Sequence, residues 1–189
     1  MIITAWFKIC NILSKLSQEI ENIICYDNYK ASKILTNNTC EQTIRKKTME
    51  TRNSVSPKDV KFYTTERLRE EFLLQNLFVR GEIKMVYSQI DRIITGAAVP
   101  IEPISLTAGA ELRADYFLQR REMGVINIGG DGIIIADGKE YHLEHRDGMY
   151  LGLGTQQIEF RSKDAQTPAK FYFNSAPAHK AYPTVLIKL

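Results

Sequence analysis

The sequence predicts an all-β fold, a sandwich or barrel of short strands, for the chain from residue 49 onward. Apolar segments in this region are short, follow a period of two or no regular period, and are divided by Gly- and Pro-marked turns. All 11 Gly and 6 Pro of the chain lie after residue 48, and turns need these residues. With 189 residues, 44% of them hydrophobic, the chain is long enough to bury a core.

Residues 1–48 differ from the rest and are interpreted as an unmatched N-terminal extension. They contain all three Cys and the only Trp of the chain. Apolar residues between Phe7 and Ile24 recur near helical spacing, which is compatible with a helix. The cysteines are widely and evenly spaced, which fits neither a zinc motif nor a disulfide framework. We interpret Met49 as the true start of the protein; a genuine targeting or partner helix is the alternative.

One short helix is expected before the strands. Thr64 or Thr65 can cap it, and Glu66 suits the positive end of a helix. Leu68 and Phe72 lie four residues apart, on one face of such a helix.

Short strands follow the helix. The segments LFV and EIKMVYS on either side of Arg80-Gly81 are expected to form a hairpin, and DRIITGAAV follows, ended by Pro100. Asp137-Gly138, between GIIIA and KEYHL, is the strongest turn signal and predicts a type I′ hairpin. The remaining expected strands are DYFLQRRE, MGVINIGG, MYLGLG, QQIEFRS and AKFYFNS.

The charge and the hydropathy of the chain each argue against one class of partner. Residues 49–189 contain 18 basic and 18 acidic side chains and are therefore neutral. Nucleic-acid binding needs a basic face that displaces counterions, so no nucleic-acid partner is expected. No segment is apolar enough to span a membrane, so no membrane partner is expected either.

One run of the sequence resembles a cupin, a small jelly-roll β-barrel, in its order of strands and turns. This run is GVINIGGDGIIIADGKEYHLEHRDGMYLGLGTQQIEF. Cupins bind metal through two sequence blocks. Glu122 and Gly129 fit the spacing of the first block, but residues 115–118, where its histidines belong, contain none. In the second block, Gln157 stands in place of the histidine. A zinc or iron site needs several converging ligands, and this barrel offers one carboxylate, so no metal site is expected.

At a finer level, the body resembles the 5-keto-4-deoxyuronate isomerases, also called 4-deoxy-L-threo-5-hexosulose-uronate ketol-isomerases. The matching stretches are EFLLQNLF, MVYSQIDRIITG, YFLQRREMGVINIGG, HRDGMYLG and TPAKFYFNSAPAHKAYPT, which cover nearly all of residues 60–184. That family is a bicupin of roughly twice this length. The resemblance therefore makes residues 49–189 the N-terminal cupin barrel, with the C-terminal metal-binding barrel missing after YPTVLIKL.

The resemblance implies a cytoplasmic, homo-oligomeric isomerase of pectin and polyuronide breakdown. Its small-molecule uronate substrate, 5-dehydro-4-deoxy-D-glucuronate, becomes 3-deoxy-D-glycero-2,5-hexodiulosonate. The family's zinc ligands, three His and a Glu, lie in the missing barrel, so this chain is expected to bind no zinc and to be inactive alone. The alternative is a non-catalytic, metal-free cupin that binds a sugar acid or serves as an assembly module.

Four residues are candidates for substrate binding, while the catalytic residues are unknown. Arg120 and Arg121 are of the residue type that recognises a uronate carboxylate; the alternative is a surface or interface ion pair with Glu122. His179 and Tyr182 lie in an extended Pro-rich segment that either helps to line a site or serves only for packing.

His142 and His145 are three residues apart in HLEH. Residues three apart on a strand point to opposite faces, so a metal-binding pair is not expected. The Gly-rich run at 129–132 resembles a phosphate loop only superficially, because no Lys-Ser/Thr follows it.

Overall fold

The computed structural model describes residues 49–189, so the predictions made for residues 1–48 lie outside the described residues. The elements, in order, are β1 (Met49–Arg52), α2 (Pro57–Val60), α3 (Thr65–Phe72), β2 (Ile83–Ser88), β3 (Ile94–Ala98), β4 (Ile104–Ser105), the 3₁₀ turn η2 (Ala110–Leu112), β5 (Arg121–Asn127), β6 (Gly132–Ala136), β7 (Lys139–Leu143), β8 (Gly148–Leu151), β9 (Ile158–Ser162), β10 (Phe171–Pro177) and β11 (Val185–Ile187).

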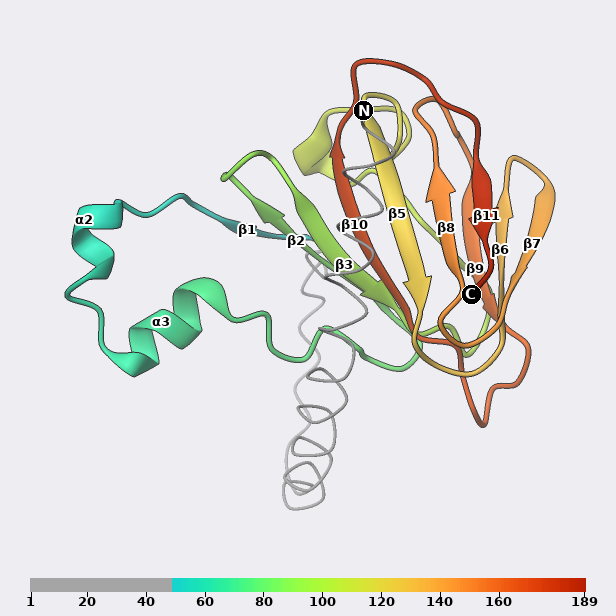
Figure 1. Ribbon diagram of the computed structural model, residues 1–189, viewed down its shortest axis with the longest axis horizontal. Coiled ribbons are helices and arrows are strands. Elements are labelled where there is room, and N and C mark those ends of the chain that lie inside the picture. Colours follow the sequence, from blue (N-terminus) through green and yellow to red (C-terminus); the bar gives the residue numbers. More distant parts are fainter. Residues whose placement is uncertain (1–48) are drawn as a thin grey trace, which may run out of the picture. The chain divides into compact units, whose positions relative to one another are not determined.

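The strands form two sheets in jelly-roll topology (Figure 1). One sheet has the order β1-β2-β3-β10-β5-β8-β11, and the other has the order β4-β9-β6-β7. The antiparallel pairs β3–β10, β4–β9, β5–β8 and β6–β7 are nested one inside the next, and alternate pairs belong to alternate sheets. This is one long hairpin rolled up on itself, and it confirms the predicted all-β jelly-roll class.

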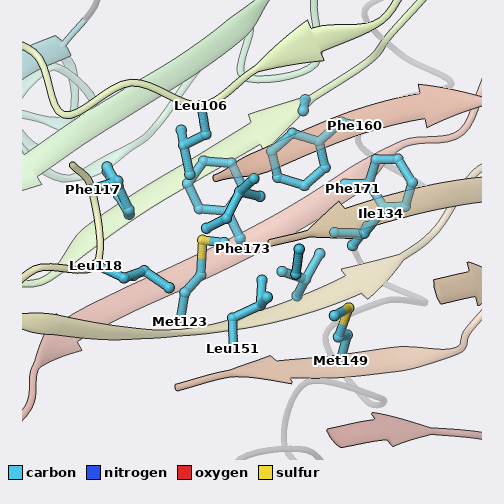
Figure 2. Packing of buried hydrophobic residues seen from close by; sticks show 14 of the residues in the cluster. Leu106, Phe117, Leu118, Met123, Ile134, Met149, Leu151, Phe160, Phe171 and Phe173 are labelled. Carbon is cyan, nitrogen blue, oxygen red and sulfur yellow. The ribbon is translucent and has the colours of Figure 1, made fainter. Parts of the chain in front are cut away.

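The core lies between the two sheets (Figure 2). Alternate residues of each strand point inward, as the period-two pattern requires. On β5 the buried inward residues are Met123 and Val125, and on β10 they are Phe171 and Phe173. The opposite sheet contributes Ile134 from β6 and Phe160 from β9.

The predicted helix is confirmed as α3. Thr64 is its N-cap, and the Thr64 hydroxyl accepts a hydrogen bond from the Arg67 backbone N–H. A further one-turn helix, α2, precedes it, with Ser56 as N-cap and Pro57 in its first turn. Neither helix contains a buried residue, so both lie outside the core.

The predicted hairpin at Arg80-Gly81 is wrong. The two neighbours of β2 are β1, which runs parallel to it, and β3, so both edges of β2 are occupied. Residues 77–79 are therefore left as a connecting segment. Arg80 forms an isolated bridge with Val99, and the Gly81 N–H donates to the Val99 carbonyl.

The expected strand DYFLQRRE is also wrong over residues 115–120, which form a turn before β5 begins at Arg121. The Asp115 and Gln119 side chains bond to each other, and the Asp115 N–H donates to the Gln119 side-chain oxygen. Phe117 and Leu118 are both buried. Two consecutive core residues are incompatible with the alternation of a strand, and the turn allows both to enter the core.

The Asp137-Gly138 hairpin is confirmed. Ala136 pairs with Lys139 across it, and the two turn residues have φ values of 48° and 81°, as a type I′ turn demands. The Asp137 carboxylate also accepts from the backbone N–H groups of Gln156 and Gln157. This side chain therefore ties the tip of the β6–β7 hairpin to the start of β9.

Asn127, at the end of β5, joins three segments at one end of the barrel. Its side-chain nitrogen donates to three carbonyl oxygens at 2.8 to 3.2 Å, those of Gly130, Leu143 and Glu144. Its side-chain oxygen accepts from the N–H groups of Gly129 and Lys170. The residue is fully buried, so water cannot replace these bonds if the amide is removed.

Asn127→Ala is expected to lower the free energy of unfolding by roughly 2–4 kcal/mol, because several buried backbone groups lose their partner. Urea denaturation measures the change. Asn174→Ala is the control, since Asn174 is only half-buried and bonds to Thr95 and Tyr172 on the outer face of the sheet. A loss no larger than that of the control would contradict the role given to Asn127.

Asp147 holds the edge strand β11 in place. Its buried carboxylate accepts from the Lys188 ammonium at 2.5 Å and from the Glu144 and Leu189 backbone N–H groups. Burial acts to raise the pKa of Asp147, but these hydrogen bonds outweigh it and hold the pKa below its ordinary value. Residues 185–187 pair with β8 as the edge strand β11.

The pH dependence of unfolding is expected to depend on this carboxylate. Because the pKa of Asp147 is lower in the folded chain than in the unfolded chain, the group stabilises the fold above about pH 4. The stabilisation is lost as the pH falls below that value and the carboxylate takes up a proton. Urea titrations should show that Asp147→Asn is less stable than the wild type at neutral pH and loses less stability on acidification. Parallel pH profiles for the two proteins would contradict this.

Candidate functional site

The interior of the barrel is filled by aromatic side chains (Figure 2). The Phe160 ring lies 5.3 Å from the Phe171 ring and 6.1 Å from the Phe173 ring, measured between centroids. Phe117 meets the edge of Phe173 at 6.5 Å. All four are at most 2% exposed. A substrate or metal site inside a barrel needs space and converging polar groups, and this interior provides neither.

The residues present do not fit a zinc ion. In the part of the chain that the structure describes, no three His, Cys, Asp or Glu side chains lie close enough together to hold one. His142 lies on β7 and His145 in the turn after it, and both are exposed. The His145 ring is near the Gly129 carbonyl, with Nδ1 and the oxygen 3.1 Å apart.

Glu122 faces away from the core, which corrects the expectation that it is the carboxylate of the barrel interior. Its neighbours Arg121 and Met123 are buried, and Glu122 occupies the alternate position on β5. The Tyr150 hydroxyl donates to it at 2.7 Å. Burial, together with this bond to a carboxylate, raises the pKa of Tyr150. Glu122 and Tyr150 therefore form a polar pair on the outer face of the larger sheet.

Arg121 is buried at the opposite end of β5 from Asn127. Its Nε donates to the Ser175 hydroxyl at 3.0 Å, and its Nη2 donates to the carbonyls of Ser175 and Arg92. The guanidinium carbon lies 5.9 Å from the centre of the Tyr87 ring. Arg121 thus links β5, β10 and the turn between β2 and β3.

Arg120 points elsewhere and is exposed. Its Nη2 donates to the carbonyls of Leu112 and Arg113, at 3.3 and 2.8 Å. Among the described residues, neither Arg120 nor Arg121 forms an ion pair with a carboxylate. Within residues 49–189, Arg121 does not pair with Glu122, because alternation along β5 places the two side chains on opposite faces. An ion pair of either arginine across a subunit interface stays a prediction.

The segment of His179 and Tyr182 crosses the larger sheet at Gly152. A Cβ atom at Gly152 would collide with the Tyr182 backbone carbonyl, so only glycine allows this approach. Tyr182 is half-buried and is one of the groups that raise the pKa of Tyr150, whereas His179 is exposed. Of the two residues, Tyr182 is the one near Tyr150.

The structure therefore separates the predicted candidates. Tyr182 lies beside Gly152, two residues from Tyr150, and Arg121 lies on the core face beside Ser175 and Arg92. Sequence reasoning missed Tyr150, Ser175 and Arg92. Alternation along a strand could have placed Tyr150 on the face opposite Met149 and Leu151, but no local signal pairs strands distant in sequence.

Two surface hollows lie away from all of these candidates. The smaller, of about 160 Å³, is bordered by α3 and the strands β1 to β3 and is lined mainly by apolar side chains such as Phe72, Leu74 and Val86. The larger, of about 590 Å³, follows β1, β2 and residues 74–79. Neither brings together groups with evident catalytic chemistry.

Purified chain is expected to retain no stoichiometric zinc after dialysis against EDTA, as measured by mass spectrometry of the metal content. A site tight enough to survive needs three or four donors, which the described residues do not bring together. A variant with Cys10, Cys25 and Cys40 all changed to Ser is the control for the N-terminal region. One zinc per chain in that variant would contradict the conclusion drawn from the barrel.

A nested jelly roll with these sequence blocks defines a protein of the cupin class. Comparison with known sequences identifies the group within that class: the chain belongs to the KduI/IolB family, whose model matches residues 72–189. Within residues 49–189, no helix is long and apolar enough to cross a membrane.

Similar curated proteins include two that carry the name 4-deoxy-L-threo-5-hexosulose-uronate ketol-isomerase. The protein from Lachnoclostridium phytofermentans is 67% identical over 141 residues, which are 74% of this chain and 51% of the relative. The protein from Lachnospira eligens is 57% identical over 140 residues, 74% of this chain and 50% of the relative. The chain thus spans about half the length of the curated relatives it matches.

Among solved structures, a cupin protein from Bacteroides fragilis aligns with 48% of this chain and 69% of its own length. The TM-score is 0.34 and the sequence identity 13%. The fold assignment rests on the strand order and pairing of the chain itself.

Proposed function

We propose that this chain serves in the ketol-isomerisation of an unsaturated-uronate derivative, 5-dehydro-4-deoxy-D-glucuronate, to 3-deoxy-D-glycero-2,5-hexodiulosonate. The observation that carries the proposal is the 67% identity over 141 residues to a protein named for this activity. The relatives' names favour the isomerase over a non-catalytic sugar-acid or assembly module. We also propose, as the family implies, that the protein is located in the cytoplasm and forms a homo-oligomer.

The reaction makes demands that the interior of this barrel does not meet. A ketol-isomerase moves a proton between neighbouring carbons through an enediol, which needs a base and a group that stabilises oxyanion charge. The inward-facing residues in the middle of the barrel are apolar, and the rings of Phe160, Phe171 and Phe173 occupy the space. The chemistry therefore belongs outside this interior.

Zinc in the full-length family would supply the oxyanion stabilisation as a Lewis acid. The residues of this barrel do not fit that ion, so no step is assigned to it here. We propose instead that residues 49–189 are the structural barrel of the isomerase. On the outer face, Glu122, Tyr150 and Tyr182 are polar groups placed to contact either substrate or a second folded unit.

The test is a chimera that joins this chain, after Leu189, to the part of the Lachnoclostridium phytofermentans relative that follows its aligned half. Isomerisation of the uronate is measured for the chain alone, the chimera and the intact relative. We expect the chain alone to be inactive and the chimera to reach within about tenfold of the relative, since the 67% identity preserves most contacts of the barrel.

Two controls make the result decisive. A chimera with Asn127→Ala should lose activity in step with its folded fraction, because that change weakens the barrel without touching a reacting group. A chimera with Asn174→Ala should keep its activity and its folded fraction. The proposal would be contradicted if the chimera folds but is inactive while the intact relative is active. Turnover by the chain alone would also contradict it.

A further inference from the structure

The end of the barrel where β5 begins holds a buried cation without a counter-charge. Arg121 is 7% exposed, and its three hydrogen bonds go to uncharged oxygens of Ser175 and Arg92. No carboxylate among residues 49–189 forms an ion pair with it. Buried charges in proteins are ordinarily paired, so an anion would be stabilised here.

One nitrogen of this guanidinium remains available. Nε and Nη2 make all three hydrogen bonds, and Nη1 makes none. Every fully buried side-chain nitrogen or oxygen in the described part of the chain has a hydrogen-bond partner. Nη1 therefore reaches the surface through the small exposed part of Arg121, with two N–H groups to donate.

Arg92 can supply a second guanidinium, since its backbone carbonyl lies 2.6 Å from Arg121 Nη2. Arg92 is exposed at the turn between β2 and β3, where Asp91 and Arg92 have φ values of 52° and 53°. Burial, with the charge of Arg92, lowers the pKa of Arg121 to about 10, while Tyr87 acts in the opposite direction. Arg121 therefore stays charged at neutral pH. Asp91 forms no ion pair with either arginine within the described region.

We propose that Arg121 Nη1 and the Arg92 guanidinium form a carboxylate-binding site at this end of the barrel, bordered by the Tyr87 ring. An anion there offsets the repulsion between the two arginines and gives the free N–H groups of Nη1 an acceptor. A carboxylate matches the planar, paired N–H donors of a guanidinium. Binding requires no turnover, so the site does not depend on the proposed isomerase activity.

The probe is sodium D-galacturonate, a sugar carboxylate, compared with neutral D-galactose at an ionic strength matched with sodium chloride. Thermal unfolding and titration calorimetry of the full 189-residue chain measure binding. We expect galacturonate alone to raise the Tm in a dose-dependent way.

Arg92→Gln tests where galacturonate binds. The change keeps the buried hydrogen bonds of Arg121, because the Arg92 backbone carbonyl still accepts from it. This change should weaken galacturonate binding roughly tenfold, the effect of losing one charged donor. Arg146→Gln is the matched control: Arg146 is also an exposed arginine at positive φ (74°), in the turn between β7 and β8. It should bind galacturonate as the wild type does.

Several outcomes would overturn the proposal. An equal Tm shift with galactose would show recognition of the sugar instead of the charge. An equal Tm shift with sodium sulfate would show that the site binds any anion without selecting a carboxylate. Equal losses in Arg92→Gln and Arg146→Gln would place binding elsewhere. Since none of these readouts involves isomerisation, an inactive chimera leaves this result unaffected.

Discussion

The strand β5 is the element on which the rest of the barrel depends. Its inward residues are Arg121, Met123, Val125 and Asn127, apolar in the middle and polar at both ends. The apolar pair packs in the core, while Asn127 binds the turns at one end and Arg121 binds Ser175 and the β2–β3 turn at the other. Seven strand residues span about 20 Å, so this one strand also sets the distance between the two ends.

The filled interior decides what the barrel can do. In a jelly roll, the space between the sheets either holds side chains or encloses a ligand. Here four phenylalanines occupy it, and the polar residues lie at the ends and on the outer face. The same packing that makes the barrel a stable scaffold removes the place where a cupin usually binds its metal. Function must therefore be sought on surfaces.

Periodicity and turn chemistry predicted much of the fold. The Asp137-Gly138 hairpin and the Thr64-capped helix depend on neighbouring residues, and both were predictable. Residues 115–120 were not, because apolar content suggested a strand while the Asp115–Gln119 bonds make a turn. The contacts of Arg121 could not be predicted for a different reason. Arg121 finds Ser175, 54 positions away, and only the strand pairing reveals that neighbour.

The nesting of the strands also sets an order in which the chain can close on itself. The β6–β7 pair needs only a two-residue turn, whereas β3 must find β10 across most of the barrel. Closing a loop costs less entropy when the intervening chain is short or already folded. The nesting therefore favours pairing that proceeds outward from Asp137-Gly138, because each pair shortens the effective loop of the next. During synthesis, the core stays open until Phe171–Pro177 has left the ribosome.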